Sequence, residues 1–411
     1  MSYSRILSCR ICGNDNLVRV LDLGQQMLTG VFPSSTTNAV TTGPISLVKC
    51  HGENDVCGLL QLEHSYAASE MYGNNYGYRS GLNPSMVAHL HRKVGRIMST
   101  VNCGNDDLIL DIGSNDSTTL QAYPADGPTL VGIDPTGTKF QKHYPAHVNL
   151  IPEFFSSEIF FSKYPGRNAK VVTSFSMFYD LDDPMKFMRD IRDVLADDGV
   201  WVFEQSYMPF MLDTNSYDTV CHEHLEFYAL SQIKWMTDRN GLKILDVEFN
   251  DINGGSFSVT VAKDNGDNTV PPAVQQILEE EQRRKLHTLE PFRDFSERIE
   301  TSKRELLRFI REVKGEGKRI VALGASTKGN VLLQYCELSP NDIDCVGEVN
   351  EEKFGRLTPG SWIPIVDENS FMVNEPDYFL ILPWHFRRFF VENRKWKKAK
   401  LVFPLPKLEI V

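Results

Sequence analysis

The 411-residue sequence predicts an α/β protein built on a doubly wound parallel sheet, with a smaller unit on either side of it. Three observations lead to this prediction. Short apolar runs alternate with helical segments from residue 108 to about 262, four cysteines are grouped before residue 60, and a new strand–turn–helix unit begins at Arg319. We therefore expect an N-terminal domain over 1–70, a central sheet domain over 71–265, and linking helices with a C-terminal α/β domain over 266–411.

Composition limits the class of protein. The chain is 41% hydrophobic and 24% charged, as expected for a globular protein with a buried core. Its net charge of −11 argues against nucleic acid as the main partner. Apolar runs fall short of the roughly 20 residues of a membrane span, and residues 1–9 lack the apolar core of a signal peptide. We expect a cytoplasmic monomer that binds neither membrane nor nucleic acid.

Four of the eight cysteines form two pairs near the N-terminus. Cys9 and Cys12 make a C-x2-C knuckle, and Cys50 and Cys57 follow a β-like stretch. Two thiolate pairs predict a tetrahedral, structural Zn²⁺ site without an open position for a catalytic water. Six residues separate the second pair where two to four are typical, so His51 as a replacement ligand and metal-free reduced thiols remain alternatives.

A loop rich in aromatic, glycine and amide residues follows between Met71 and Met86, before a helix expected over 86–101. Loops of this kind can close over a pocket, and Tyr76 and Tyr78 would then contribute phenol hydroxyls. A plain surface loop is the alternative interpretation.

The central domain is organised around the apolar strand expected over 108–112 and the turn that follows it. Polar and glycine residues suited to a ligand site stand at this turn: Asp111, Gly113, Asn115 and Asp116. We expect the last two to cap a following helix. The next strand ends at Asp134, about twenty residues later, the offset at which a carboxylate meets a ribose diol. A dinucleotide-binding turn would read G-x-G-x-x-G, whereas this pattern resembles motifs I and II of class I S-adenosyl-L-methionine (SAM) methyltransferases. An ordinary strand–turn–helix unit is the alternative.

Further strands are expected over 130–134, 170–175, 199–204, 242–249 and 256–262, with helices over 183–195 and 231–240. This alternation predicts a doubly wound sheet with an edge pair, as in methyltransferases. Phe154 lies where such folds hold adenine, and Ser174 stands near the end of one strand. Both are candidate cofactor-binding residues.

The sequence His222-Glu223-His224 follows the strand that ends near Glu204. Histidine is the commonest general base, and a neighbouring acid can fix its tautomer. The spacing is not the H-E-x-x-H of zinc proteases. A histidine cluster with a purely structural role is the alternative.

One or two long linking helices are expected over 271–318, and a strand then leads into a turn with amide donors and one cation, suited to a phosphate. The residues of this turn and its helix are Ser326, Thr327, Lys328 and Asn330. The turn lacks the G-x4-G-K-[ST] pattern of a P-loop. Glu348 ends the next strand and Arg356 follows it.

These elements, in this order, resemble the SAM-dependent C-methyltransferases that act on nucleotide-linked 4-keto-6-deoxysugars. The resemblance covers nearly the whole chain. It is carried by Cys9-x2-Cys12, Leu21-Asp-Leu-Gly24, Cys50 and Cys57 with Leu60-Gln-Leu, Asp111-Ile-Gly113-Ser-Asn115-Asp116, Glu223-His224, Gly254-Gly255-Ser256, Gly324-Ala-Ser326-Thr-Lys328-Gly-Asn330 and Leu357-Thr-Pro-Gly360. It implies a zinc-binding N-terminal domain, a class I methyltransferase middle domain and a Rossmann-like C-terminal domain, with SAM and Zn²⁺ as cofactors.

The resemblance also implies roles. His224 is then the base and Glu223 its companion, in the removal of a proton from C3 beside a C4 ketone, and Tyr76, Tyr78 or His222 could stabilise the enolate oxygen. The dTDP- or GDP-linked keto-deoxysugar would contact Asp180, Cys221, Ser326, Thr327, Lys328, Asn330, Glu348 and Arg356. Some family members carry tyrosine in place of Cys221 and histidine in place of Asp180, which leaves the sugar and the attacked carbon open. The alternatives are methylation of another acceptor, such as an oxygen or a different sugar carbon, and a non-catalytic nucleotide-binding module.

Overall fold

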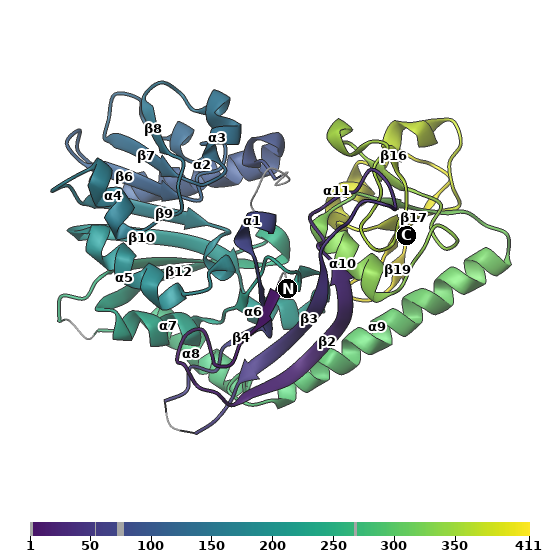
Figure 1. Cartoon of the computed structure of the whole chain (residues 1–411), viewed down its shortest axis with the longest axis horizontal. Helices are drawn as coiled ribbons and strands as arrows, with labels where there is room; N and C mark the ends of the chain where they lie inside the picture. The colour runs from purple at the N-terminus through teal and green to yellow at the C-terminus, as the bar shows by residue number, and fades with distance from the viewer. Residues whose placement is uncertain (1–2, 54, 72–77, 267–268) are drawn as a thin grey trace.

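The computed structural model describes residues 3–53, 55–71, 78–266 and 269–411 (Figure 1). Within these ranges the chain forms a seven-stranded, a six-stranded and a four-stranded sheet, and a small two-stranded one. The seven-stranded sheet and the six-stranded sheet lie on opposite sides of the four-stranded sheet (Figure 1). A long helix runs beneath the six-stranded and the four-stranded sheets (Figure 1).

The N-terminal sheet is completed by a strand from the middle of the chain. Its order is β11-β4-β3-β2, with all neighbours antiparallel. The strands are β2 (Leu17–Met27), β3 (Thr42–Cys50), β4 (Leu60–Leu62) and β11 (Glu226–Phe227), while β1 (Tyr3–Arg5) pairs with β5 (His64–Tyr66). Because β11 begins two residues after His224, the His222–His224 segment lies at the junction of two sheets.

The central sheet has the order β12-β13-β10-β9-β6-β7-β8. The strands are β6 (Leu108–Ile112), β7 (Thr129–Ile133), β8 (Val148–Ile151), β9 (Ala169–Phe175), β10 (Leu195–Ser206), β12 (Leu242–Asn250) and β13 (Ser256–Lys263). Strands β6 to β10 are parallel, and β13 runs antiparallel to both of its neighbours. The predicted doubly wound sheet with an edge pair is confirmed, and β8 is a strand that the sequence pattern did not indicate.

The chain after β6 differs from the expectation. Cap-type residues after Gly113 predicted an α-helix, but an irregular turn and a short 3-10 helix, η2 (Leu120–Ala122), follow instead. Asn115 and Ser117 have φ angles of 48° and 67°. A right-handed helix cannot continue through residues in this left-handed region, so the prediction of a helix here was wrong.

The C-terminal sheet has the order β16-β15-β14-β17-β18-β19 and is parallel except for its last strand. The strands are β14 (Ile320–Leu323), β15 (Val346–Glu348), β16 (Ile365–Asp367), β17 (Tyr378–Ile381), β18 (Lys400–Phe403) and β19 (Glu409–Ile410). Strand β14 leads through Gly324 into a helix whose N-cap is Ser326, as the strand–turn–helix pattern predicted.

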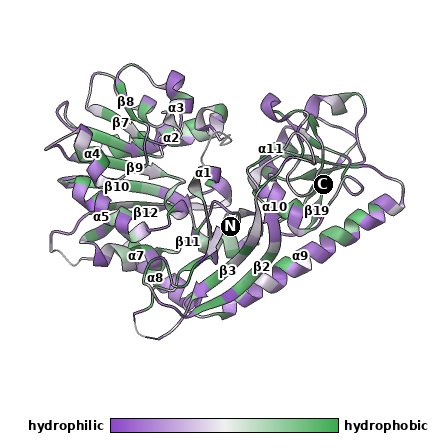
Figure 2. Cartoon of the chain, viewed as in Figure 1, coloured by the Kyte–Doolittle hydropathy of each residue, from purple (hydrophilic) through white to green (hydrophobic). Residues whose placement is uncertain are grey.

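The helices are α1 (Ala68–Met71), α2 (Pro84–Thr100), α3 (Gly137–Phe140), α4 (Ser157–Lys163), α5 (Pro184–Val194), α6 (Met208–Asp213), α7 (Leu230–Arg239), α8 (Pro272–Arg283), α9 (Glu290–Gly315), α10 (Thr327–Tyr335) and α11 (Arg387–Glu392). The strands are mainly apolar, whereas α9 alternates polar and apolar residues along its length (Figure 2). Its apolar face is buried, including Phe292, Phe295 and Ile299, so this long helix packs as an amphipathic support. Within the described ranges, every helix falls short of the length and apolar content that crossing a bilayer requires.

The connection between β2 and β3 reaches the C-terminal domain. The Met27 amide donates to Gln334 Oε1 at 2.8 Å, and Asn330 Nδ2 donates to the Thr29 carbonyl at 2.7 Å. The Leu357 amide donates to the Pro33 carbonyl at 2.8 Å. Backbone and side-chain hydrogen bonds therefore hold the N-terminal and C-terminal domains together.

Candidate active site

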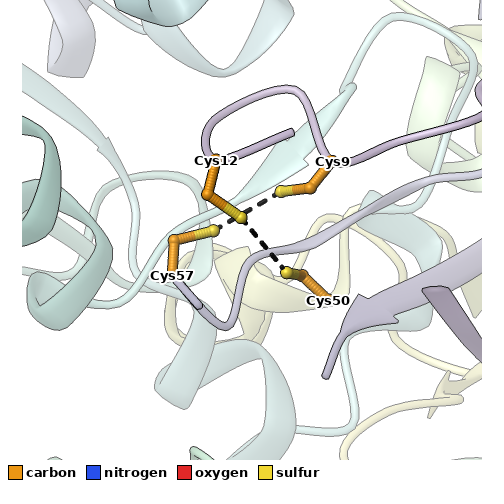
Figure 3. Close-up of side chains that lie close together, drawn as sticks. All are labelled: Cys9, Cys12, Cys50 and Cys57. Atoms are coloured by element: carbon orange, nitrogen blue, oxygen red, sulfur yellow. Dashed lines mark hydrogen bonds between the residues drawn. The ribbon is translucent and has the colours of Figure 1, made fainter. Parts of the chain in front are cut away.

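Four cysteine side chains converge in the N-terminal domain (Figure 3). The Sγ atoms of Cys9, Cys12, Cys50 and Cys57 all lie within 4.8 Å of one another, with Cys9–Cys57 at 3.4 Å and Cys12–Cys50 at 3.5 Å. These separations exceed the roughly 2.05 Å of a disulfide. They are close to the sulfur–sulfur distance of about 3.8 Å that a tetrahedral zinc ion with Zn–S bonds of about 2.3 Å requires. Asn14 Nδ2 lies 3.3 Å from Cys50 Sγ and can orient that ligand.

One large cavity of about 400 Å³ opens at the carboxyl ends of the central strands, where doubly wound sheets bind their ligands. Residues predicted from sequence line this cavity from three separate parts of the chain: Tyr78, Asp111, Gly113, Asn115, Asp134, Phe154, Asp180, Glu223, His224, Thr327 and Lys328. The structure therefore brings the predicted cofactor residues, the predicted base and part of the C-terminal turn to one cavity.

The part of the cavity predicted to hold the cofactor is formed by the ends of β6 and β7. Asp134 is buried, and its carboxylate accepts from the Asn115 amide at 2.8 Å and from the Thr136 amide and hydroxyl at 2.6 Å each. Gly113 has a φ of +71°, and a Cβ there would lie 3.1 Å from the side chain of Met177. A glycine turn beside a fixed carboxylate fits the nucleoside part of SAM, with Asp134 available to the ribose hydroxyls.

Asp111 lines this part of the cavity as well. Its carboxyl accepts a hydrogen bond from Thr173 Oγ1 at 2.5 Å. Burial raises the pKa of Asp111 to about 7. The exposed ring of Phe154 lies at the rim of the same cavity, where it could cover a bound adenine.

Asn115 and Asp116 bind residues 78–81, in the described part of the aromatic loop. Asn115 Oδ1 accepts from the Ser80 amide at 3.1 Å, and Asn115 Nδ2 donates to the Tyr78 carbonyl at 3.2 Å. Asp116 Oδ2 accepts from the Gly81 amide at 3.0 Å. Asp116 does not line the cavity, and its hydrogen bond stabilises the position of this loop.

His224 lines the same cavity and has a defined tautomer. Its Nδ1 lies 2.7 Å from the Thr219 carbonyl oxygen, which can only accept, so Nδ1 carries the proton and Nε2 keeps its lone pair. Burial, with a smaller contribution from the Lys328 ammonium, lowers the pKa of His224 to about 4. The imidazole is therefore neutral at physiological pH, which is the state that a base needs.

Glu223 is half-buried beside His224. Burial raises the pKa of its carboxyl above the usual value. A Cβ at Gly30, in the connection between β2 and β3, would lie 2.7 Å from Glu223 Oε1. The N-terminal domain thus packs its backbone directly against this acid.

Several predicted residues lie away from the cavity. The His222 ring packs edge-on against Tyr66 with ring centroids 4.6 Å apart, and Cys221 is fully buried. Ser174 Oγ accepts from Trp201 Nε1 at 3.0 Å. Tyr76 lies outside the described residues.

The outer residues of the C-terminal turn also have internal partners. Ser326 Oγ caps α10 through the Gly329 amide, Asn330 bonds to Thr29, Glu348 accepts the amides of Val349 and Asn350, and Arg356 donates to the carbonyls of Glu352 and Phe32. Of the turn residues predicted to bind substrate, Thr327 and Lys328 are the two that line the cavity.

The sequence reasoning missed other residues that form this site. Tyr179 and Asn253 line the cavity, and the Thr219 carbonyl sets the tautomer of His224. Asn253 precedes the Gly254-Gly255 pair, which was a detectable signal. The role of the Thr219 carbonyl could not be predicted, because every residue carries a backbone carbonyl whatever its type.

Comparisons with known proteins agree with this architecture. Three family models match the chain: "Putative zinc binding domain" over residues 9–72, "Methyltransferase domain" over 86–247, and "C-methyltransferase C-terminal domain" over 251–406. The C-methyltransferase NovU of Streptomyces niveus is 28% identical over 410 residues, which cover 98% of this chain and 96% of NovU.

Solved structures align with less than half of the chain. A chain from the complex between the Haloferax volcanii Trm112 methyltransferase activator and a methyltransferase is 12% identical, with a TM-score of 0.37, and covers 45% of this chain and 95% of its own. Magnesium protoporphyrin IX methyltransferase (ChlM) of Synechocystis PCC 6803 is 9% identical, with a TM-score of 0.33, and covers 43% and 79%.

Proposed function

We propose that this chain, which belongs to the SAM-dependent C-methyltransferases with a zinc-binding N-terminal domain, methylates C3 of a nucleotide-linked 4-keto-6-deoxysugar through an enolate. The observation that carries the proposal is the position of His224. A neutral imidazole with its Nε2 lone pair available lines the same cavity as the predicted cofactor residues Gly113 and Asp134.

Methylation of carbon requires a carbanion equivalent, and a ketone at C4 makes the C3 hydrogen acidic because the charge can move to oxygen. In the proposed reaction His224 Nε2 accepts the C3 proton, a step in which a positioned base contributes roughly 10²–10⁴ in rate. The Thr219 carbonyl accepts from Nδ1 and so stabilises the imidazolium that forms. SAM, when bound, supplies the methyl group as an electrophile.

The neighbours of His224 support this assignment. Tyr179 packs its ring against the imidazole, with centroids 4.6 Å apart, and holds its orientation. Glu223 adds a carboxyl on the adjacent residue. The cavity of about 400 Å³ is within the range of ligand sites in proteins, about 300–1,000 Å³.

Solvent deuterium exchange at C3, measured without SAM, tests the first step directly. The probes are a dTDP-linked and a GDP-linked 4-keto-6-deoxyhexose, followed by NMR analysis of the product formed with SAM. We expect exchange with at least one probe, a new C–CH3 signal, and a loss of about 10²–10⁴ in the exchange rate for His224→Asn with unchanged SAM affinity.

His222→Asn is the matched comparison, because His222 belongs to the same motif but packs against Tyr66. Exchange that persists in His224→Asn and disappears in His222→Asn would transfer the role of base. A product with O–CH3 and no exchange would favour an O-methylating enzyme.

A further inference from the structure

A half-buried cation lines the same cavity as the proposed base. Lys328 lies in the first turn of α10 and lines the cavity next to Thr327. Its Nζ donates to the Asn253 carbonyl at 2.8 Å. An ammonium carries three N–H donors, and within the described residues the Asn253 carbonyl takes one of them, which leaves two for a ligand. Among the described residues that line this cavity, Lys328 is the one lysine or arginine.

The surroundings keep this charge inside the protein. Asp218 is buried behind the cavity wall and attracts Lys328 electrostatically, while its Oδ2 accepts from Trp384 Nε1 at 2.8 Å. Burial lowers the pKa of Lys328, and Asp218 and Cys221 oppose this shift. The charge of Lys328 in turn lowers the pKa values of His224 and His385. The ammonium and the imidazole therefore influence each other across the one cavity that both side chains line.

The reaction needs a donor that the predicted residues do not readily supply. His222 faces Tyr66, and Tyr78 is about half exposed on its loop. The enolate oxygen is the atom on which negative charge develops, and a preorganised donor in a water-poor cavity stabilises such charge most effectively.

We propose that Lys328 is a catalytic residue that donates a hydrogen bond to the enolate oxygen, an inference that rests on the proposed C3 methylation. The C3–H bond breaks, its proton goes to His224 Nε2, and the electron pair moves to the C4 oxygen beside the ammonium. The pair would then return to C3 and form the C3–CH3 bond while the S–CH3 bond of SAM breaks, so that S-adenosyl-L-homocysteine leaves with the S–C electron pair and the ketone is restored. The C-terminal domain therefore contributes directly to the chemical step.

The competing role for Lys328 is a contact with the diphosphate of the nucleotide. The two roles differ in what a variant loses. A phosphate contact stabilises the bound ground state and the transition state alike, so its loss raises KM and leaves the saturated rate unchanged. An enolate contact exists only as charge develops, so its loss lowers the saturated rate.

The test is SAM-independent deuterium exchange at saturating keto-sugar for Lys328→Met, which keeps an unbranched side chain one atom shorter and removes the charge. We expect a fall of about 10²–10³ in the exchange rate, with little change in the Kd of the keto-sugar. Lys353→Met is the matched control, because Lys353 Nζ donates to the Ala325 carbonyl at 2.7 Å near the same turn but lies outside the cavity lining. Its exchange rate should match the wild type. A normal saturated rate with a raised KM for Lys328→Met would overturn the proposal.

Zinc content and thermal melting establish that Lys328→Met is folded. If it is not, a crystal structure of the wild type with the keto-sugar decides instead: Nζ within hydrogen-bonding distance of the C4 oxygen supports the proposal, and Nζ on the diphosphate overturns it. The two hypotheses fail separately. Wild-type protein without exchange on either probe refutes the proposed function, whereas exchange that is equal in wild type and Lys328→Met refutes the role of Lys328 alone.

Discussion

Replacement of Asp134 by alanine should weaken SAM binding and stability by amounts that can be separated. The carboxylate accepts three hydrogen bonds, from the Asn115 amide and from the Thr136 amide and hydroxyl. Losing them costs on the order of 1 kcal/mol each, or about 3 kcal/mol of stability. Loss of the charged partner of the ribose hydroxyls should cost SAM a further 1–3 kcal/mol of binding free energy, or about 5- to 150-fold in Kd.

The assay is calorimetric titration with SAM at a temperature where the variant is folded, alongside thermal melting. Asp107→Ala is the control. Asp107 Oδ2 accepts from the Gly104 amide at 2.7 Å just before β6, so this residue lies at the amino end of that strand, away from the cavity at the carboxyl ends. It should lose stability without losing SAM affinity. If the Kd values of Asp134→Ala, Asp107→Ala and wild type agree, Asp134 does not hold the ribose and the assignment of this part of the cavity is wrong.

Two further predictions concern the metal and pH. Protein purified without chelator should contain about one equivalent of zinc. Removing the zinc, or replacing Cys50 by serine, should lower the melting temperature. Metal-free wild-type protein with an unchanged melting temperature would contradict the zinc assignment. The C3 exchange rate should stay constant as pH falls from 7 to about 5 and then drop as the pH approaches the lowered His224 pKa of about 4, because protonation removes the Nε2 lone pair. A limb centred near the ordinary histidine pKa of 6.5, recorded on protein shown by circular dichroism to remain folded, would show that the base is not this buried imidazole.

Local patterns predicted much of this molecule. The apolar run at 108–112, the glycine at its end and the acid at Asp134 lie on adjacent parallel strands, so their convergence follows from the sheet alone. The cysteine pairs were also readable, since C-x2-C knuckles arise from short-range geometry. The turn after Gly113 was wrongly expected to be a helix because cap-type residues also favour the left-handed backbone that Asn115 and Ser117 adopt.

Longer-range packing could not be read in the same way. Which histidine of His222-Glu223-His224 faces the cavity depends on Tyr66 on one side and the Thr219 carbonyl on the other. The residues predicted to bind phosphate present a similar case. Asn330 bonds to a carbonyl about three hundred positions earlier in the chain, a contact that no residue pattern near Asn330 announces.

The β11 strand has a consequence for protein engineering. Glu226 and Phe227 complete the sheet that carries the cysteine cluster, although they directly follow the segment that bears His224. A chimera that exchanges the first 70 residues between relatives would therefore join a foreign β4 to a native β11, and any misfit would be transmitted within two residues to the imidazole. Crossover points for recombination should instead be chosen so that residues 225–228 are exchanged together with the N-terminal sheet.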